Sequence, residues 1–592
     1  MSRRATSVAV VVAIAMVLAS CSVFGGSETT TTTTSTTLPP TTTSTIPEPT
    51  TTTEAKPQHP YGGEAIVADR QEPPTLNAFA PGGNQLIVSL IGQGYAAGVQ
   101  DVDGTTLLLV PELVTELPTV ENGGVVINVD GTMTVNLTIR DDAVWEDGEP
   151  ISGDDFQFTL DTIMNPDYPI TRTTYENIFS TEVGPKTFSY TLVAPTVQYE
   201  TLFNEIIPKH AVEGTDFMAD WNDTRWPSNG PFKFDSWVKG ESLTLVRNDA
   251  YWKVDEETDQ QLPYLDSVTW RFIPEPADEL EAFKTKEVDI VNPDSDTRDI
   301  GVLKALEARG ARVEVLPGQY WEHVNFQFGP GRLDRNPNSC NDEYEMRLAV
   351  AQTIDKDVIT EDILGGHIEP LSSYVEAYSP TLSHANWDQY PVDHAAANRN
   401  YLSAVAALGV ECSVVFTTAS SSADRVRLSE LLVGMFEASG IPYENDLEDS
   451  QLFFGATLSD ARWDMSEWSW QSSPGLFSLV RIHDVMDPGG ALPGGSNYYD
   501  WGTETSSVVD ESTVRFKEVR DAMNATVDER ELVALIEEAE AIVADNLVII
   551  PLYARRVTAA VWADEIGNFL HNPTSAGYPW NVEFWYRADQ DV

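Results

Sequence analysis

Nucleophiles, metal ligands and paired acids would give this chain covalent chemistry, and none occurs in a recognisable pattern. The sequence contains neither a Gly-x-Ser-x-Gly turn nor a His-Glu-x-x-His helix. The eight histidines are scattered, and the closest pair, His384 and His394, lacks a metal-ligand spacing. Because the chain has 92 acidic residues, some carboxylates must lie close together, so acids that are close in the sequence do not indicate general acid–base catalysis. We therefore predict no catalytic residue, no metal site and no cofactor.

Cys21 is placed for a covalent modification rather than for catalysis. A short basic segment precedes the apolar run Val8–Leu18, which is typical of an export signal and shorter than the roughly 20 residues that cross a bilayer. The residues Leu-Ala-Ser-Cys that end at Cys21 resemble the lipobox of bacterial lipoproteins, whose cysteine is lipidated and becomes the first mature residue. The resemblance implies a signal peptide over residues 1–20 and a lipid anchor at Cys21. The alternative is a secreted protein with an incidental thiol.

The segment that follows Cys21 consists mainly of Thr, Ser and Pro. Almost nothing in residues 21–58 can be buried, so burial cannot offset the entropy lost on ordering. We expect a disordered tether whose ends lie on the order of 35 Å apart. Such a tether would hold a folded body away from a membrane surface.

The remainder of the chain, from His59, is too long for one hydrophobic core and is predicted to divide into lobes. The formal net charge of −56 repels nucleic acid and anionic lipid. We therefore expect no nucleic-acid partner and membrane contact through the lipid anchor only. Cys340 and Cys412 either form a disulfide or remain two thiols, and the sequence leaves both alternatives open.

Local patterns predict a mixed α/β body without a strict βαβ repeat. Apolar and polar residues alternate on both sides of Asp130-Gly131, which predicts a hairpin. Ser152 and Asp155 have the spacing of a capping box and predict a helix start. Apolar residues at helical spacing over Leu532–Val543 predict a helix, and the strand-like sequence LVIIPLY follows it.

Seven segments of the body carry a resemblance to a known family. They are PPTLNAF, VWEDGEPISGDDFQFTLD, IIPKH, SNGPFKFDSWVKGESLTLVRNDAYW, KTKEVDIV, EMRLAVAQTIDKDVI and VIIPLY. In this order they resemble segments of the large extracytoplasmic solute-binding proteins of ABC importers. The matching group is family 5, which includes peptide, dipeptide and nickel binders.

The resemblance implies an α/β, two-lobed periplasmic-binding-protein fold of the cluster C type. Lobe I would comprise residues 59–318, with an extra subdomain at about 85–226, and lobe II residues 319–551. The C-terminal residues 552–592 would return to lobe I. The family further implies a monomer on the extracytoplasmic face of a bacterial cell membrane, which closes around a solute and docks on ABC importer permease subunits.

Flat aromatic side chains at the implied cleft are the first candidates for ligand contacts. The resemblance puts Tyr320 and Trp321 where the chain crosses into lobe II, and Trp470 matches a tryptophan of a family segment. Asn497 and Tyr498 resemble the family's Asn-Tyr segment that faces the cleft. The alternative for these two is a structural turn with buried aromatics.

The residues after that tryptophan depart from the family pattern. Peptide-binding members typically carry an aspartate there, which pairs with the α-ammonium of the ligand, whereas this chain has Gln471, Ser472 and Ser473. A buried ammonium without a partner is costly, so the run favours a neutral, hydroxyl-rich ligand or a blocked peptide. Asp464 or Glu467 would replace the missing acid only if the loop is shifted.

We therefore expect a lipid-anchored solute-binding protein that delivers an oligopeptide or another, uncharged solute to an ABC importer without enzymatic activity. One alternative is a ligand sensor or surface adhesin on the same scaffold. Another is an anchored extracellular hydrolase, which would need a nucleophile or a metal site.

Overall fold

The computed structural model describes residues 56–293, 297–379, 382, 384–492 and 495–590, with backbone alone at 297–299. These residues belong to one unit, Lys56–Val592. The predicted signal peptide, Cys21 and residues 21–55 of the predicted tether lie outside the described part. No helix in the described part is both long enough and apolar enough to cross a membrane.

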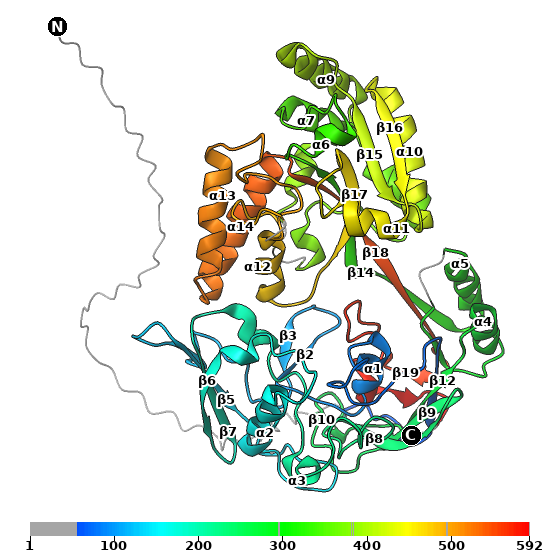
Figure 1. Cartoon of the computed structure of the whole chain (residues 1–592). Coiled ribbons are helices and arrows are strands. Elements are labelled where there is room, and N and C mark those ends of the chain that lie inside the picture. The colour runs from blue at the N-terminus through cyan, green and yellow to red at the C-terminus, as the bar shows by residue number, and fades with distance from the viewer. Residues whose placement is uncertain (1–55, 294–296, 380–381, 383, 493–494, 591–592) are drawn as a thin grey trace, which may run out of the picture. The chain divides into compact units, whose positions relative to one another are not determined.

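A 10-stranded mixed sheet runs through both lobes (Figure 1). Its strands are β1 (Glu64–Asp69), β8 (Phe232–Val238), β9 (Ser242–Arg247), β12 (Ser267–Phe272), β13 (Ile290–Val291), β14 (Ala311–Phe326), β15 (Val414–Ala419), β16 (Tyr443–Glu448), β17 (Met465–Gln471) and β18 (Ile549–Trp562). Their order is β16-β15-β17-β14-β18-β13-β1-β12-β9-β8. The antiparallel strands β14 and β18 join the two lobes.

β14 and β18 are longer than the sequence pattern predicts. β14 extends over Ala311–Phe326, and β18 continues past Tyr553, where the strand-like sequence LVIIPLY ends, to Trp562. The sequence pattern is broken near the middle of each strand, by a Pro-Gly pair in β14 and by two arginines in β18. The strands nevertheless continue because each is paired along its length with the other.

The pairing of β14 with β18 changes register between the lobes. Pro317 lies opposite Arg556, whereas Trp321 lies opposite Ala554, so β14 carries extra residues at this point. Proline has no N–H to donate, and a bulge is one of the few positions that tolerate it in a sheet. The predicted lobe boundary at 318/319 falls within this irregular stretch, and the domain boundaries remain predictions.

Lobe I contains the β13–β8 half of the large sheet and a second sheet. The second sheet has the order β4-β5-β7-β6. The further elements of this lobe are β2 (Gln100–Val102), β3 (Leu109–Pro111), β4 (Val125–Ile127), β5 (Met133–Thr138), β6 (Ile178–Val183), β7 (Thr187–Leu192), β10 (Val254–Asp255), β11 (Gln260–Gln261), β19 (Ile566–Gly567), β20 (Tyr586–Arg587), α1 (Leu86–Gly92), α2 (Gly153–Met164), α3 (Lys209–Val212), α4 (Pro276–Lys284) and α5 (Thr297–Leu306). Both local predictions are confirmed here: β4 and β5 form the hairpin around Asp130-Gly131, and Ser152 and Asp155 form the capping box of α2.

Lobe II packs its helices on the β14–β16 half of the sheet and beside it (Figure 1). They are α6 (Arg332–Arg335), α7 (Tyr344–Thr353), α8 (Lys356–Leu364), α9 (His394–Leu408), α10 (Ala423–Ser439), α11 (Ser450–Leu452), α12 (Leu476–Asp484), α13 (Glu511–Met523) and α14 (Glu529–Asp545). The predicted apolar stripe on α14 is confirmed, since Leu532, Ile536 and Val543 are buried. Cys340 and Cys412 form a disulfide, with their Cα atoms 5.7 Å apart.

Candidate functional site

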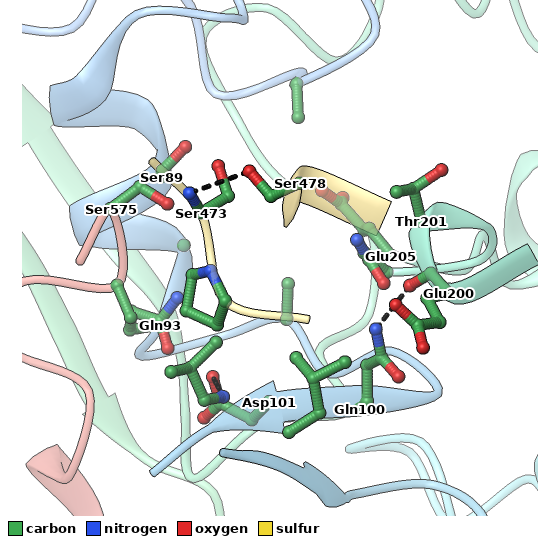
Figure 2. Close-up of a pocket in the computed structure, with 18 of the residues that line it drawn as sticks. Ser89, Gln93, Gln100, Asp101, Glu200, Thr201, Glu205, Ser473, Ser478 and Ser575 are labelled. Carbon is green, nitrogen blue, oxygen red and sulfur yellow. Dashed lines mark hydrogen bonds between the residues drawn. The ribbon is translucent and has the colours of Figure 1, made fainter. Parts of the chain in front are cut away.

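A cavity of about 550 Å³ lies between the lobes (Figure 2). Lobe I contributes α1, β2 and the short helical segment η2 (Val197–Thr201). Lobe II contributes the loop and first turns of α12, from Ser473 to Arg481, and Ser575 and Ala576 of the C-terminal return complete the wall. Because both lobes supply side chains, this cavity is the candidate functional site.

Most polar side chains of the cavity are uncharged, but two carboxylates stand out. Glu205 is ion-paired with the buried Arg225, and Arg481 lies 2.8 Å from Asp484. Within the described residues, by contrast, Asp101 and Glu200 have no basic side chain at ion-pair distance, and no three His, Cys, Asp or Glu side chains are grouped to hold a metal ion. The cavity therefore holds two acids without an ion-pair partner among the described residues, although the charge of Lys253 acts to lower the pKa of Asp101.

Burial raises the pKa of both acids. The pKa of Asp101 rises to about 7, mainly because burial disfavours its charged form, although the Val102 amide opposes the rise. The pKa of Glu200 also rises to about 7 through burial, which the amides of Phe477 and Leu476 oppose. A cation that entered the cavity would favour the ionised form of each acid.

Glu200 also links the two lobes at the start of α12. Its Oε2 atom accepts a hydrogen bond of 3.3 Å from the Phe477 N–H. Amides in the first turn of a helix have no partner within the helix and carry partial positive charge, which favours a carboxylate. Gly475 permits this approach: its φ is +95°, and a Cβ there would lie 2.9 Å from Glu200 Oε2.

A second cavity of about 830 Å³ adjoins the first. It lies between the β4–β7 sheet region of lobe I and helices α12 and α14 of lobe II, and aliphatic side chains dominate its wall. Examples are Leu108, Leu117, Val120, Leu476 and Val533. Gln100, Leu109 and Glu200 belong to the walls of both cavities. The two cavities therefore meet at a shared wall that contains a carboxylate.

The three residues of the uncharged run Gln471–Ser473, which was predicted to face the ligand, have different surroundings in the structure. Ser473 lines the first cavity. Ser472 is buried, and its hydroxyl donates to the Gln319 carbonyl at 3.0 Å. Gln471 ends β17 opposite Tyr320, whose hydroxyl donates to the Gln471 side chain at 3.3 Å. Ser473 is the member of the run that reaches this cavity.

The predicted aromatic contacts lie within or beside the core of lobe II. Trp321 is fully buried, and its indole N–H donates to the Tyr378 hydroxyl at 3.3 Å. Tyr378 lines the second cavity, so Trp321 supports that wall from behind. The Trp470 indole donates to Tyr499 at 2.8 Å, and its ring centroid is 5.8 Å from that of Tyr498.

The surroundings of Asn497 match the alternative given from the sequence, which is a structural turn with buried aromatics. It is buried, and its amide donates to the carbonyls of Asp487 and Trp501 at 2.9 and 3.0 Å. Seven predicted ligand residues line neither cavity, and their ligand roles remain predictions: Tyr320, Trp321, Trp470, Gln471, Ser472, Asn497 and Tyr498.

Asp464 and Glu467, the two acids considered as replacements for the missing aspartate, form hydrogen bonds inside lobe II. Asp464 accepts hydrogen bonds from Asn336 and Asn341, and Glu467 accepts one of 2.9 Å from Thr418. Neither lines the first or the second cavity. The cavity acids come from lobe I instead, where no motif marks Asp101 or Glu200. Only the folded arrangement brings β2 and η2 opposite α12.

Comparisons with known proteins agree with the fold. The sequence profile described as bacterial extracellular solute-binding proteins, family 5 middle, matches residues 109–477, more than half of the chain. The chain is 21% identical to the dipeptide-binding protein DppE of Bacillus subtilis (strain 168) over 266 residues, which cover 41% of this chain and 45% of DppE.

Two further proteins are similar to this chain, one in sequence and one in structure. The oligopeptide-binding protein OppA of Bacillus subtilis (strain 168) is 25% identical over 272 residues, covering 42% of this chain and 46% of OppA. The aligned stretches thus span less than half of each relative. The solved structure of the periplasmic EDTA-binding protein EppA superposes with a TM-score of 0.68 at 19% identity, covering 91% of this chain and 99% of EppA. The two-lobed α/β fold is therefore confirmed, and the chain belongs to family 5 of the bacterial extracellular solute-binding proteins.

Proposed function

We propose that this chain is a lipid-anchored, extracytoplasmic solute-binding protein that delivers a small solute to an ABC importer. The observation that carries the proposal is the cavity of about 550 Å³ whose walls come from both lobes. A ligand held there contacts both lobes at once, so its binding favours the closed conformation over the open one. Permease subunits would then recognise that closed conformation.

The proposed hinge is the irregular stretch of β14 and β18. Hinges are short segments that absorb a change in backbone angles, and the register shift between Pro317 and Trp321 is such a segment. On this proposal, residues 59–318 and 552–592 move as lobe I, and residues 319–551 move as lobe II.

The proposed solute is an oligopeptide or a molecule of similar size. The two cavities, of about 550 and 830 Å³, fall in the range of roughly 300–1,000 Å³ that is usual for ligand sites. The names of DppE, OppA and EppA record a dipeptide, an oligopeptide and EDTA as ligands of those proteins. Lipidation at Cys21 and the Thr/Pro-rich tether would keep this chain at the membrane that holds the importer.

A ligand panel tests the proposal. The melting temperature of the purified chain is measured with di- to pentapeptides, N-acetylated peptides, oligosaccharides and nickel chelates. A ligand at a hundred times its dissociation constant adds about 2.7 kcal/mol of stability, which raises the melting temperature. Uptake of the labelled hit into vesicles with importer permeases should require the chain. Binding without uptake would favour a sensor, and no shift with any compound would contradict the proposal.

A further inference from the structure

We propose that the second cavity, of about 830 Å³, binds a neutral and largely aliphatic molecule whose oxygen atoms accept hydrogen bonds from the hydroxyls of Tyr190 and Tyr378. This inference rests on the proposed solute-binding function and names the chemical class of the solute. An acyl ester and a peptide blocked at both ends share this chemistry. A neutral ligand is also what the run Gln471–Ser473 favours in the sequence.

Tyr190 of β7 supplies a hydroxyl without a partner. It lines the second cavity, and only 2% of its surface is exposed because its ring packs beside Phe188 and Phe203. The Tyr190 hydroxyl forms no hydrogen bond with any described residue, and its oxygen is not fully enclosed by the protein. A polar group buried without a hydrogen bond is costly, so an acceptor on a ligand in the cavity would be stabilising.

Tyr378 supplies a second donor from lobe II. It follows the short helical segment Val375–Ala377, lines the same cavity and is 5% exposed. Its oxygen accepts the hydrogen bond from the Trp321 indole, which can only donate, so the hydroxyl proton has no acceptor among the described residues. The third tyrosine of this wall, Tyr199, differs because its hydroxyl already donates to the Pro118 carbonyl at 3.2 Å.

The rest of the wall fits an aliphatic ligand. Leu108 and Val120 of lobe I line the cavity although 54% and 39% of their surfaces are exposed to solvent. Leu476 and Val533 line it from lobe II. Covering such apolar surface with an apolar group gains free energy roughly in proportion to the area covered. An aliphatic chain, or several aliphatic side chains, would cover it.

The charges of the wall favour a neutral ligand. The charged residues of this wall are Glu121, Glu200, Asp528, Glu529 and Arg530. Arg530 is already paired with Glu121, so the remaining acids repel an anionic ligand. Glu200 accepts a hydrogen bond from the Phe477 amide, and the other three acids are exposed to water, which screens their attraction for a cation.

Calorimetric titration of the purified full chain tests the ligand class with two pairs of probes. Methyl octanoate should bind about tenfold or more tightly than octanoate, and N-acetyltrileucine amide should exceed trileucine by a similar factor, because the charged groups find no partner in the cavity. Affinity should rise about fourfold per methylene from methyl butanoate to methyl octanoate. Binding of the ester alone would assign an acyl ligand, and binding of the blocked peptide alone would assign a blocked peptide.

Two conservative variants test the hydrogen bonds. Tyr190→Phe and Tyr378→Phe each remove a hydroxyl and keep the ring, and each should weaken binding of the neutral probe about fivefold. A hydrogen bond lowers the stretching frequency of a carbonyl, so the infrared carbonyl band of the bound probe should move to higher wavenumber when its donor is removed. A merely structural tyrosine would not cause that shift.

Tyr61→Phe is the matched control. Tyr61 is an exposed tyrosine of lobe I whose hydroxyl donates to the Gln261 carbonyl, and it lines neither cavity. Its substitution should change neither the affinity for the neutral probes nor the carbonyl band. Melting of each unliganded variant reports whether it is folded.

The outcomes distinguish this inference from the proposed function. Equal affinity for the neutral and charged members of both pairs overturns the inference, as does binding of a neutral probe that neither tyrosine variant weakens. If the four probes fail while a sugar or chelate of the wider panel raises the melting temperature, the inference is wrong and the solute-binding function stands. If no compound of either set binds, both are wrong.

Discussion

The buried carboxylates Glu322 and Glu467 of lobe II and the partly buried cavity acids Asp101 and Glu200 differ in their surroundings. In lobe II, Glu322 of β14 and Glu467 of β17 share Arg425 of α10, whose nitrogens lie 3.3 and 3.4 Å from them. Arg555 of β18 adds a hydrogen bond of 2.6 Å to Glu322. The fold itself therefore supplies the cations that this pair requires.

The acids of the interlobe cavity form no ion pair within the described residues, although Lys253 acts on Asp101 through its charge. Asp101 and Glu200 come from β2 and η2, and the charged groups beside Glu200 include a further acid, Glu529 of α14. The comparison shows that burial alone does not mark a binding group. An acid whose charge is compensated by ion pairs can stay ionised when buried, whereas burial pushes an acid without an ion pair toward its neutral form.

The pKa values follow this difference. Burial opposes ionisation of Glu322, but the hydrogen bond with Glu467 and the charges of Arg425 and Arg555 lower its pKa to about 2. Burial and the neighbouring charge of Glu322 raise the pKa of Glu467 well above its usual range. In the cavity, burial raises the pKa of both acids to about 7.

Removing the shared arginine of lobe II should have the largest effect. Arg425→Met leaves two carboxylates buried with reduced compensation, and we expect the free energy of unfolding to fall by about 3–5 kcal/mol. Urea denaturation measures this loss. The control Arg427→Met lies on the same helix but on its exposed side, and its denaturation midpoint should not move. Equal effects of the two substitutions would contradict the assignment.

The same Glu→Gln substitution should change the free energy of unfolding in opposite directions at Glu322 and at Glu200. Glu322→Gln removes the anion that Arg425 and Arg555 require and should cost about 2–3 kcal/mol of stability. Glu200→Gln removes a charge that burial disfavours and should raise stability at pH 8 by about 1 kcal/mol, since the amide oxygen still accepts from Phe477. Denaturation of both variants at pH 8 gives the comparison. A loss of stability in Glu200→Gln would mean that its carboxylate is neutralised after all.

The pH dependence of the free energy of unfolding should report the ionisation of the two cavity acids, Asp101 and Glu200. Between the ordinary pKa of Glu200, 4.5, and its raised value of about 7, the folded chain holds a proton that the unfolded chain has released. The contribution of Glu200 to stability is therefore present at low pH and is lost as pH rises through 7, and Asp101 acts in the same direction. The charged groups that face the two acids and shape this response are Glu529, Glu112, Glu583 and Lys253.

We expect stability to fall by about 1–2 kcal/mol more between pH 5 and pH 8 in the unmodified chain than in the double variant Asp101→Asn/Glu200→Gln. Thermal unfolding in matched buffers at the two values measures this difference. Parallel changes in the two proteins would show that the cavity acids titrate as they do in the unfolded chain.

The smallest effect is expected at an exposed ion pair between the lobes. Arg530 of α14 and Glu121 of lobe I are paired, but 84% and 73% of their side-chain surfaces are exposed. Water already solvates both charges, so Arg530→Ala should lower stability by less than about 0.5 kcal/mol. Chemical denaturation at low and moderate salt measures it. A larger loss would mean that surface pairing contributes to closure as strongly as the buried groups do.

Sequence patterns predict the parts of this fold that depend on neighbouring residues. The turn at Asp130-Gly131, the capping box of Ser152 and Asp155, and the apolar stripe of α14 were all predictable because each is specified within a few residues. The full lengths of β14 and β18 were not, because pairing between distant strands carries them through segments without a strand pattern.

The candidate site was harder to predict for the same reason. Trp321 and Tyr320 are adjacent in β14, so their side chains point to opposite faces, and no local pattern tells which face is buried. Asp101 and Glu200 lie far apart in the sequence, in segments with no motif. Their proximity to α12 depends on how the lobes meet, which residue spacing does not encode.

The position of β18 has a consequence for the order in which the chain assembles during its synthesis. β18 fills the place between β13 and β14, so until Ile549–Trp562 has been made, each of those strands presents an unpaired backbone edge. Open edges of this kind pair readily with other chains. A nascent chain therefore cannot complete the sheet that links its two lobes until Ile549–Trp562 has been made, and a chain that stops before Ile549 would leave both edges open to aggregation.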